Sequence, residues 1–248
     1  MELGIRGKRA VVCASSKGLG KATAAALAAD GARVAICSRV AEHIESAAAE
    51  IPGAIPFVAD IATEAGARAF VRRAADTLGG VDILVANGGG PPAGTFASTE
   101  QEAYRVAIEQ HCLSVIAMCR EVVPGMQAAG WGRVLAITSV AVRQPIATLI
   151  LSNTARAGLT GFLKTLAREV VADGVTVNSI QPGSHATERI VALRSAEGAG
   201  GADLGESSPP IGRPEDFGKV AAFLCSDPAR YVTVAALHVD GGSYQGLQ

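Results

Sequence analysis

The sequence has almost no net charge, no long apolar run and no apolar stretch at its start. A formal net charge of -1 over 248 residues gives no electrostatic reason to expect nucleic acid or an anionic membrane as a partner. No apolar run reaches the length that spans a bilayer, and residues 1–9 lack the apolar core of a signal peptide. We therefore expect a cytoplasmic protein with neither a nucleic-acid nor a membrane partner.

Cysteine is also sparse, and its spacing excludes the usual paired sites. The five cysteines are scattered, and no two of them form a Cys-x-x-Cys pair. Disulfide frameworks and zinc sites both depend on paired spacings. We predict reduced, mostly buried cysteines and no metal site. The cysteines are Cys13, Cys37, Cys112, Cys119 and Cys225.

Short apolar runs alternate with alanine-rich helical patterns along the chain. The hydrophobic fraction of 49% and the 29 glycines suit buried parallel strands joined by tight turns. This alternation predicts an α/β fold: a single Rossmann-type, doubly wound parallel sheet of about seven strands with helices on both faces. We expect one domain over residues 1–248. The strand-like runs are residues 10–13, 34–37, 55–58, 81–85, 134–137, 175–180 and 236–239.

One stretch, around residues 188–210, has only a weak pattern. It is rich in glycine and ends in two prolines. Long loops inside compact domains are often functional. We predict a substrate lid there, and a plain surface loop is the alternative.

A glycine-containing loop separates the first predicted strand from the first predicted helix. Gly18 and Gly20 allow the backbone to approach a ligand closely, and the helix N-terminus offers N–H groups to a pyrophosphate. This position predicts dinucleotide binding, and a simple tight turn is the alternative. The loop residues are Ser15, Ser16, Lys17, Gly18, Leu19 and Gly20.

The second predicted strand ends without an acidic residue. An acidic side chain there would bind a ribose 2′-hydroxyl, whereas a hydroxyl with an arginine suits a 2′-phosphate. This chain has Ser38 and Arg39 at that place, and Lys17 could reach the same phosphate. The pattern favours NADP(H) over NAD(H), although Arg39 alone could be a solvated surface residue.

Further motifs follow in a fixed order and carry a family resemblance. They are Cys13 to Gly20, Asp60-Ile61, Ala86-Asn87-Gly88-Gly89, Pro182-Gly183-Ser184-His185-Ala186-Thr187 and Val239-Asp240-Gly241-Gly242. With them the chain resembles the short-chain dehydrogenase/reductase family, of the bacterial 3-oxoacyl-carrier-protein reductase type, nearly end to end. The resemblance implies that Asp60 and Ile61 cap the adenine pocket, that Asn87 and Gly88 line the cofactor, and that the segment from Pro182 to Thr187 cradles the nicotinamide carboxamide.

The resemblance also locates a catalytic set, which in this family is Asn, Ser, Tyr and Lys. Those four positions fall on His111, Ser139, Ser152 and Arg156. Only Ser139 keeps the family residue. The phosphate loop departs as well, since Cys13 and Ala14 replace the family's threonine and first glycine.

The departures change what chemistry the site can do. In the usual site a phenol gives a proton to a carbonyl, and a neighbouring ammonium lowers the pKa of that phenol and holds the ribose. Residues 152 and 156 share one helix face, so Arg156 can still bind ribose hydroxyls. An aliphatic hydroxyl at Ser152 is a much poorer acid. His111 or His185 could supply the proton instead, although each could equally be a packed side chain.

Two functions share these motifs. The first is an NADP(H)-dependent oxidoreductase with an atypical site, which reduces a carbonyl or a conjugated enone of a small molecule or acyl thioester. The second is a catalytically inactive nicotinamide-nucleotide-binding protein that acts as a sensor or an assembly subunit. A purely structural protein is a third reading, which the retained cofactor motifs disfavour. The resemblance also implies a homotetramer formed by paired long helices and edge contacts near the C-terminus, with Cys112, Met118 and Phe162 as candidate contacts or core residues.

Overall fold

The computed structural model describes residues 2–188 and 211–247, so all of the predicted lid except Glu188 lies outside the described residues. A seven-stranded parallel sheet forms the centre, with strand order β3-β2-β1-β4-β5-β6-β7. This confirms the predicted fold class. The strands are β1 Arg9–Val12, β2 Arg33–Ser38, β3 Ile55–Val58, β4 Ile83–Ala86, β5 Gly132–Ile137, β6 Val175–Pro182 and β7 Ala236–Val239.

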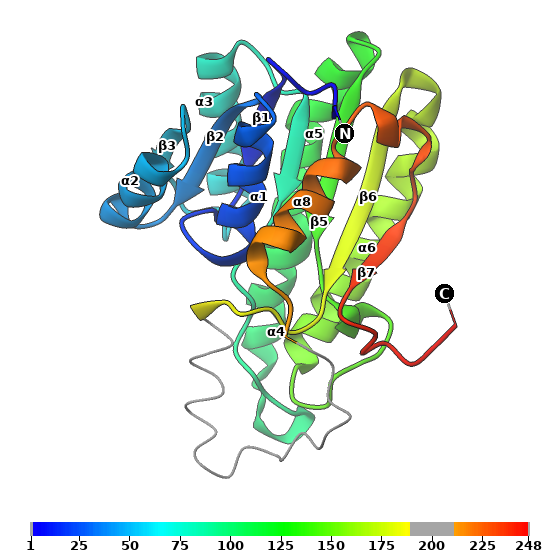
Figure 1. Ribbon diagram of the computed structural model, residues 1–248. Helices are drawn as coiled ribbons and strands as arrows, with labels where there is room; N and C mark the ends of the chain where they lie inside the picture. The colour runs from blue at the N-terminus through cyan, green and yellow to red at the C-terminus, as the bar shows by residue number, and fades with distance from the viewer. Residues whose placement is uncertain (1, 189–210, 248) are drawn as a thin grey trace.

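Helices cover both faces of the sheet (Figure 1). The main helices are α1 Gly18–Ala29, α2 Ala41–Glu50, α3 Glu64–Leu78, α4 Gln101–Ile108, α5 Ser114–Ala128, α6 Ile150–Val170 and α8 Pro214–Leu224. A π-helical turn, η2 Glu109–Leu113, joins α4 to α5. Short 3₁₀ turns are η1 Phe96–Ser98, η3 Val140–Val142, η4 Val171–Asp173 and η6 Pro228–Tyr231.

The strands alternate their side chains between two apolar cores. Val11 and Cys13 face the core that α3, α5 and α6 complete, whereas Ala10 and Val12 face the core of α1, α2 and α8. This period of two is what buries both faces of a parallel sheet. Four of the five cysteines are buried, as predicted for core residues.

The strand order reverses beside β1, which pairs with β2 on one side and with β4 on the other. In open α/β sheets ligands bind outside the carboxyl ends of the strands at such a switch point. The carboxyl ends point toward the lower end of Figure 1, where α4 and the C-terminal tail lie. The candidate site is therefore expected at that edge.

Candidate active site

The phosphate loop runs from the end of β1 to the start of α1, as predicted. Gly18 has a φ of +58°, which favours glycine. A Cβ at Gly20 would lie 2.6 Å from the carbonyl oxygen of Ala14 and 2.6 Å from Asn87 Nδ2. Glycine is required at position 20 because the loop packs directly on Asn87. Asn87 Nδ2 in turn donates to the carbonyl oxygens of Cys13 at 3.2 Å and Ala14 at 3.1 Å.

Ser15 links the phosphate loop to β2 through a hydrogen bond. Its side chain is buried, and its Oγ donates to the carbonyl oxygen of Val12 at 2.8 Å. The same Oγ accepts from the backbone N–H of Cys37 at 3.2 Å. The hydroxyl therefore has a structural task, and the neighbouring Ser16 and Leu19 are only partly buried at the loop surface.

The two cations predicted to contact a 2′-phosphate differ in their surroundings. Lys17 Nζ lies 2.9 Å from Glu188 Oε2, and both side chains are mostly exposed. That hydrogen bond lowers the pKa of Glu188. Arg39 is exposed and has no ion pair within residues 2–188 and 211–247. Ser38 Oγ donates to the carbonyl oxygen of Val40 at 2.9 Å. Because Lys17 is paired with Glu188, Arg39 is the more available of the two cations.

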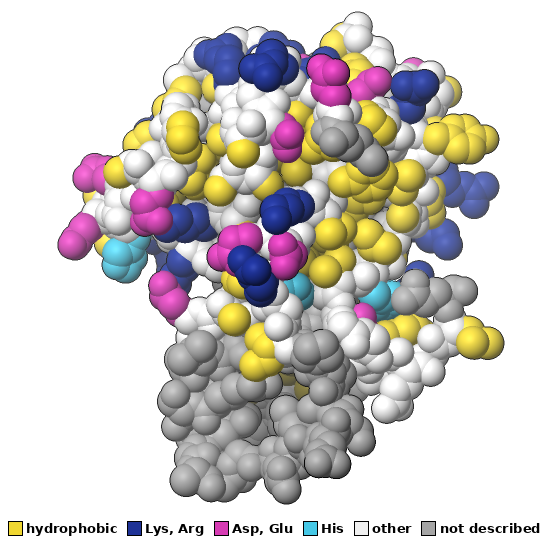
Figure 2. All heavy atoms as spheres, viewed as in Figure 1, with side chains coloured by type: hydrophobic (Ala, Val, Ile, Leu, Met, Phe, Trp, Pro, Cys, Tyr) yellow, Lys and Arg dark blue, Asp and Glu magenta, His cyan; other side chains and the backbone are white. Residues whose placement is uncertain are grey.

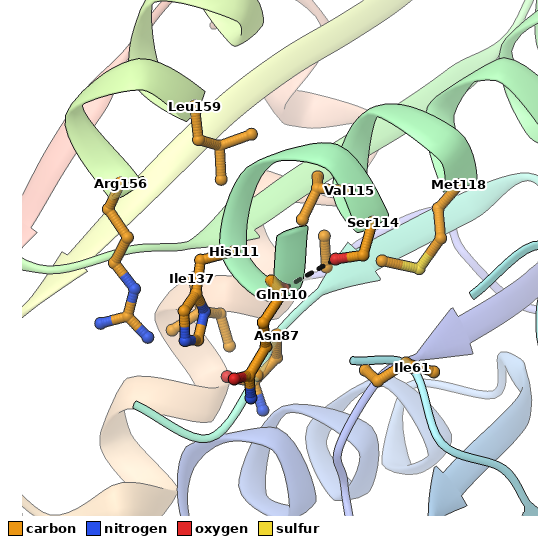
Figure 3. A pocket seen from close by; sticks show the side chains of 12 residues that line it. Ile61, Asn87, Gln110, His111, Ser114, Val115, Met118, Ile137, Arg156 and Leu159 are labelled. Atoms are coloured by element: carbon orange, nitrogen blue, oxygen red, sulfur yellow. Dashed lines mark hydrogen bonds between the residues drawn. The ribbon is translucent and has the colours of Figure 1, made fainter. Parts of the chain in front are cut away.

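One pocket gathers residues from five separate segments at the carboxyl edge of the sheet (Figure 3). Arg156 extends from α6 and His111 from the π-helical turn toward the same space. His111 is buried, and a Cβ at Gly88 would lie 3.5 Å from its Nδ1 and Cε1. The other lining residues are Ile61, Ala86, Asn87, Gln110, Ser114, Val115, Met118, Ile137 and Leu159.

Gln110 and Ser114 are site residues that the sequence reasoning missed. Ser114 Oγ donates to the carbonyl oxygen of Gln110 at 2.7 Å (Figure 3). Both residues reach the pocket because the π-helical turn Glu109–Leu113 changes the phase of the helix. Such turns recur at functional sites, but nothing in the local sequence marks one.

The two serines of the catalytic set lie close to this pocket in the chain but do not line it. Ser139 follows β5 and begins η3, where its Oγ accepts from the backbone N–H of Ala141 at 3.1 Å. Ser152 is buried in the first turns of α6. Its Oγ accepts a long hydrogen bond of 3.4 Å from Arg156 Nη1, so the predicted pairing of residues 152 and 156 is confirmed.

His185 lies apart from this pocket. Its ring is buried and meets Phe217 of α8 edge-on, with the ring centres 5.1 Å apart. Nδ1 lies 3.2 Å from the carbonyl oxygen of Gly183, and the ring lines a separate hollow with Val220 and Val239. Burial lowers the pKa of His185. The placement gives no support to His185 as the proton donor.

The remaining predicted cofactor residues border the same edge. A Cβ at Gly18 would lie 3.5 Å from Thr187 Cγ2, so the segment after β6 returns to the phosphate loop. Gly183, which follows Pro182, packs so closely on Asp240 that a Cβ would lie 2.8 Å from its Cα. At the far end, Asp60 Oδ1 accepts from the backbone N–H of Ala62 at 3.0 Å.

The predicted cofactor residues follow β3, β4 and β6 and lie between β1 and α1, at the carboxyl edge of the parallel sheet. In residues 2–188 and 211–247 no three His, Cys, Asp or Glu side chains gather into a metal-binding group. No helix in those ranges is long and apolar enough to cross a membrane.

Comparison with known proteins agrees with this geometry. The family model described as enoyl-(acyl carrier protein) reductase matches residues 13–244. Nodulation protein G of Azospirillum brasilense is 35% identical, covering 96% of this chain and 99% of that one. The 3-oxoacyl-[acyl-carrier-protein] reductase FabG of Vibrio cholerae is 32% identical, covering 98% and 99%.

A solved structure shares the fold over its whole length. L-sorbose reductase from Gluconobacter frateurii, complexed with NADPH and L-sorbose, superposes with a TM-score of 0.93. It is 31% identical, and the match covers 100% of both chains. Fold, motif order and identity over almost the whole length agree, and the chain belongs to the short-chain dehydrogenase/reductase family.

Proposed function

We propose that this chain is an NADP(H)-dependent reductase whose active site works without a phenol. Its substrate is a small molecule or acyl thioester that bears a carbonyl or a conjugated enone. The observation that carries the proposal is the shared pocket of Arg156 and His111 beside Gly88, at the sheet edge where the cofactor motifs gather. The cofactor, when bound, supplies hydride from its nicotinamide.

Ser139 is the donor to the substrate oxygen in this proposal. Its Oγ already accepts a hydrogen bond from the backbone N–H of Ala141. A hydroxyl that accepts from the backbone still has its own proton to donate. Ser139 can therefore stabilise negative charge that develops on the substrate oxygen.

Arg156 supplies fixed positive charge and binds ribose hydroxyls. A guanidinium stays protonated at any pH that a protein experiences, so Arg156 cannot itself release a proton. It also donates to Ser152 Oγ, which holds this hydroxyl beside the cation.

His111 is the proton donor that the placement favours. It lies in the pocket with Arg156, whereas His185 packs on Phe217 elsewhere. Imidazole titrates near neutrality and can act as a general acid. We assign His111 this role because no phenol stands at position 152.

The missing phenol favours a substrate that needs little acid at oxygen. When hydride adds to the carbon of an enone, an enolate forms, and an enolate needs hydrogen-bond donors more than a strong acid. Ser139 and Arg156 provide such donors. An activated enone is therefore the preferred substrate class over a simple ketone.

The test is NADPH consumption with a matched enone and saturated ketone. We expect faster turnover of the enone, and we expect Ser139→Ala to lower kcat by about 10²–10³ while NADPH affinity is kept. Turnover of the ketone at the faster rate would contradict the substrate assignment.

The inactive-binder alternative rests on one observation. Ser152 Oγ is buried and does not line the pocket, so nothing at position 152 takes the place of the missing acid. Tight NADPH binding without turnover of either substrate would favour that reading.

Cofactor choice depends on Arg39. Its exposed guanidinium is placed after β2, where a 2′-phosphate would lie, and an acidic competitor is absent from that turn. Arg39→Ala should weaken NADPH binding by about 1.5–3 kcal/mol, the value of a charged hydrogen bond, and should leave NADH binding unchanged. Calorimetry with both cofactors measures this, and an equal loss for NADH would refute the assignment.

A further inference from the structure

Gln181, near the end of β6, is a buried amide without a hydrogen-bond partner. The residue has no exposed surface, and neither Nε2 nor Oε1 has a bond. Buried polar groups are nearly always satisfied, by protein or by ordered water, because an unmade bond is costly. A methionine or leucine would fill this space without that cost. We therefore expect the Gln181 amide to bind a polar partner.

The strand register places Gln181 on the face that α6 covers. Val175 and Val177, which share its parity along β6, pack in the core with Leu159 and Leu163 of α6. Side chains two residues apart lie on one face of a strand. Gln181 therefore lies on the α6 side of the sheet, at its carboxyl edge.

The active-site serines lie at the same edge. Because α6 connects β5 to the parallel strand β6, it runs back along the sheet, and its first turn lies at the carboxyl ends of the strands (Figure 1). Ser152 is the one polar residue among the buried side chains of α6. On the neighbouring strand, Thr138 N donates to the carbonyl oxygen of Ile180 at 2.9 Å, and Thr138 immediately precedes Ser139.

We propose that Gln181 is a positioning residue for Ser152. Its amide binds a buried water that bridges β6 to Ser152 Oγ and so fixes the direction of that hydroxyl. Buried waters bond to groups that are otherwise unsatisfied. The amide offers one acceptor and two donors, while Ser152 Oγ, which accepts from Arg156, retains a proton to donate. The effect on catalysis rests on the proposed function.

Thr176 provides a matched control on the same strand. It is buried, and its Oγ1 also lacks a partner. It lies near the other end of β6 and, by parity, on the opposite face. Thr176→Val removes a hydroxyl that has no partner, so it should not lower the urea midpoint of unfolding. Gln181→Met, which also loses the bridging water, is compared with it.

The decisive experiment combines crystallography with kinetics. Crystals of the NADPH-bound wild type should show a water within hydrogen-bond distance of the Gln181 amide and Ser152 Oγ, and Gln181→Met should lose that water and change the Ser152 rotamer. An amide bonded only to other groups, with no link to Ser152, would overturn the proposal. Gln181→Leu replaces Gln181→Met if the latter does not fold.

In solution, Gln181→Met should lower kcat by about ten- to a hundredfold, because a displaced Ser152 hydroxyl no longer holds Arg156, the cation that the proposed function uses at the substrate oxygen. NADPH affinity should stay unchanged, and Thr176→Val should keep the wild-type kcat. A Gln181→Met variant with the wild-type kcat would also overturn the proposal. If the wild type turns over no substrate, the proposed function fails, and the crystallographic comparison alone decides the role of Gln181.

Discussion

Two residues, Ala14 and Val234, hold a backbone conformation that L-residues adopt at a cost. Their φ angles are +44° and +64°, and they are the non-glycine residues with positive φ in the described ranges. Val234 is fixed there because its N–H donates to the carbonyl oxygen of Val177 at 3.0 Å, while the next N–H, of Ala235, donates to Asn178 Oδ1 at 3.0 Å. The pairing of β6 with β7 thus holds Val234, just before β7, in a strained conformation.

This strain predicts a reversed order of stability at position 234. Val234→Gly and Val234→Ala remove nearly the same packing, but only glycine relieves the left-handed backbone. The relief is about 1–2 kcal/mol, and the greater freedom of glycine in the unfolded chain offsets about 0.4–1 kcal/mol of it.

Urea unfolding of the two variants measures this difference. We expect the glycine variant to be more stable than the alanine variant by about 1 kcal/mol. At most strand positions alanine is the more stable of the two. The usual order, with alanine ahead, would contradict the strained backbone.

At the scale of single residues, the sequence predicted which residue type a position needs better than it predicted where a side chain points. The need for glycine at position 20 followed from the motif, and the structure adds its cause, the contact with Asn87. The direction of the His185 ring did not follow, because it depends on Phe217, which lies 32 positions further along the chain. Likewise Lys17 pairs with Glu188 only because the fold brings them together.

Among the secondary-structure elements, β1 and β4 are joined at their amino ends by an ion pair. Arg9 Nε donates to Asp82 Oδ2 at 2.8 Å, and Nη2 donates to Oδ1 at 2.6 Å. Burial raises the pKa of Asp82, but the hydrogen bonds from the Arg9 side chain and backbone outweigh it and hold the pKa below its ordinary value. The pair therefore stabilises the sheet when Asp82 is ionised.

The sign of this shift predicts a stability loss in acid. Because the folded pKa of Asp82 is depressed, its contribution is present above the unfolded pKa of about 3.9 and disappears as the pH falls through the folded value. At pH 7, Asp82→Asn should cost about 1.5–3 kcal/mol.

Urea unfolding between pH 7 and pH 3 tests this loss. The difference between wild type and Asp82→Asn should shrink below about pH 4. Glu102→Gln, which alters an exposed pair with Arg105, is the control and should change little at any pH. A difference between wild type and Asp82→Asn that stays constant over the range would contradict the account.

Regular elements were predictable because each carries its own periodic signal. The seven strand-like runs match the seven strands to within a few residues. The π-helical turn has no such signal, since a turn of 5 residues is too short to show a period of its own. Gln110 and Ser114 were missed for that reason.

At the scale of the whole molecule, apolar side chains reach the surface along α4 and over the region of α8 and β7. Met118 is buried in the core on the α5 side of the sheet, whereas Cys112 and Phe162 are partly exposed. Val106, Ile108 and Leu113 are exposed along α4 and the π-helical turn. Every residue of the edge strand β7 is half-buried, and Figure 2 shows hydrophobic side chains gathered over the region of α8 and β7.

If each of these two surfaces pairs with its own copy, the two contacts generate a closed assembly of four, so we predict a homotetramer. Light scattering at micromolar concentration should give four times the chain mass of 25.1 kDa. Leu113→Glu should reduce the tetramer to dimers by placing charge in the helical contact. A monomeric wild type would refute the assignment of both surfaces.

Because of the additional residue in the π-helical turn, the segment Glu109–Leu113 cannot lose a residue without turning α4 relative to α5. A substitution of a side chain in the turn has no such effect. Successive residues of an α-helix are rotated by about 100°. Deleting one residue from Glu109–Leu113 would turn α4 by that angle relative to α5 and carry Ala107 off Leu151 and Ala155, against which it packs. Replacing the side chain at position 111 leaves this angular offset untouched. A chain built this way can alter the group that it presents to the pocket at position 111 by a single substitution, whereas a single deletion at the same place would disrupt its packing.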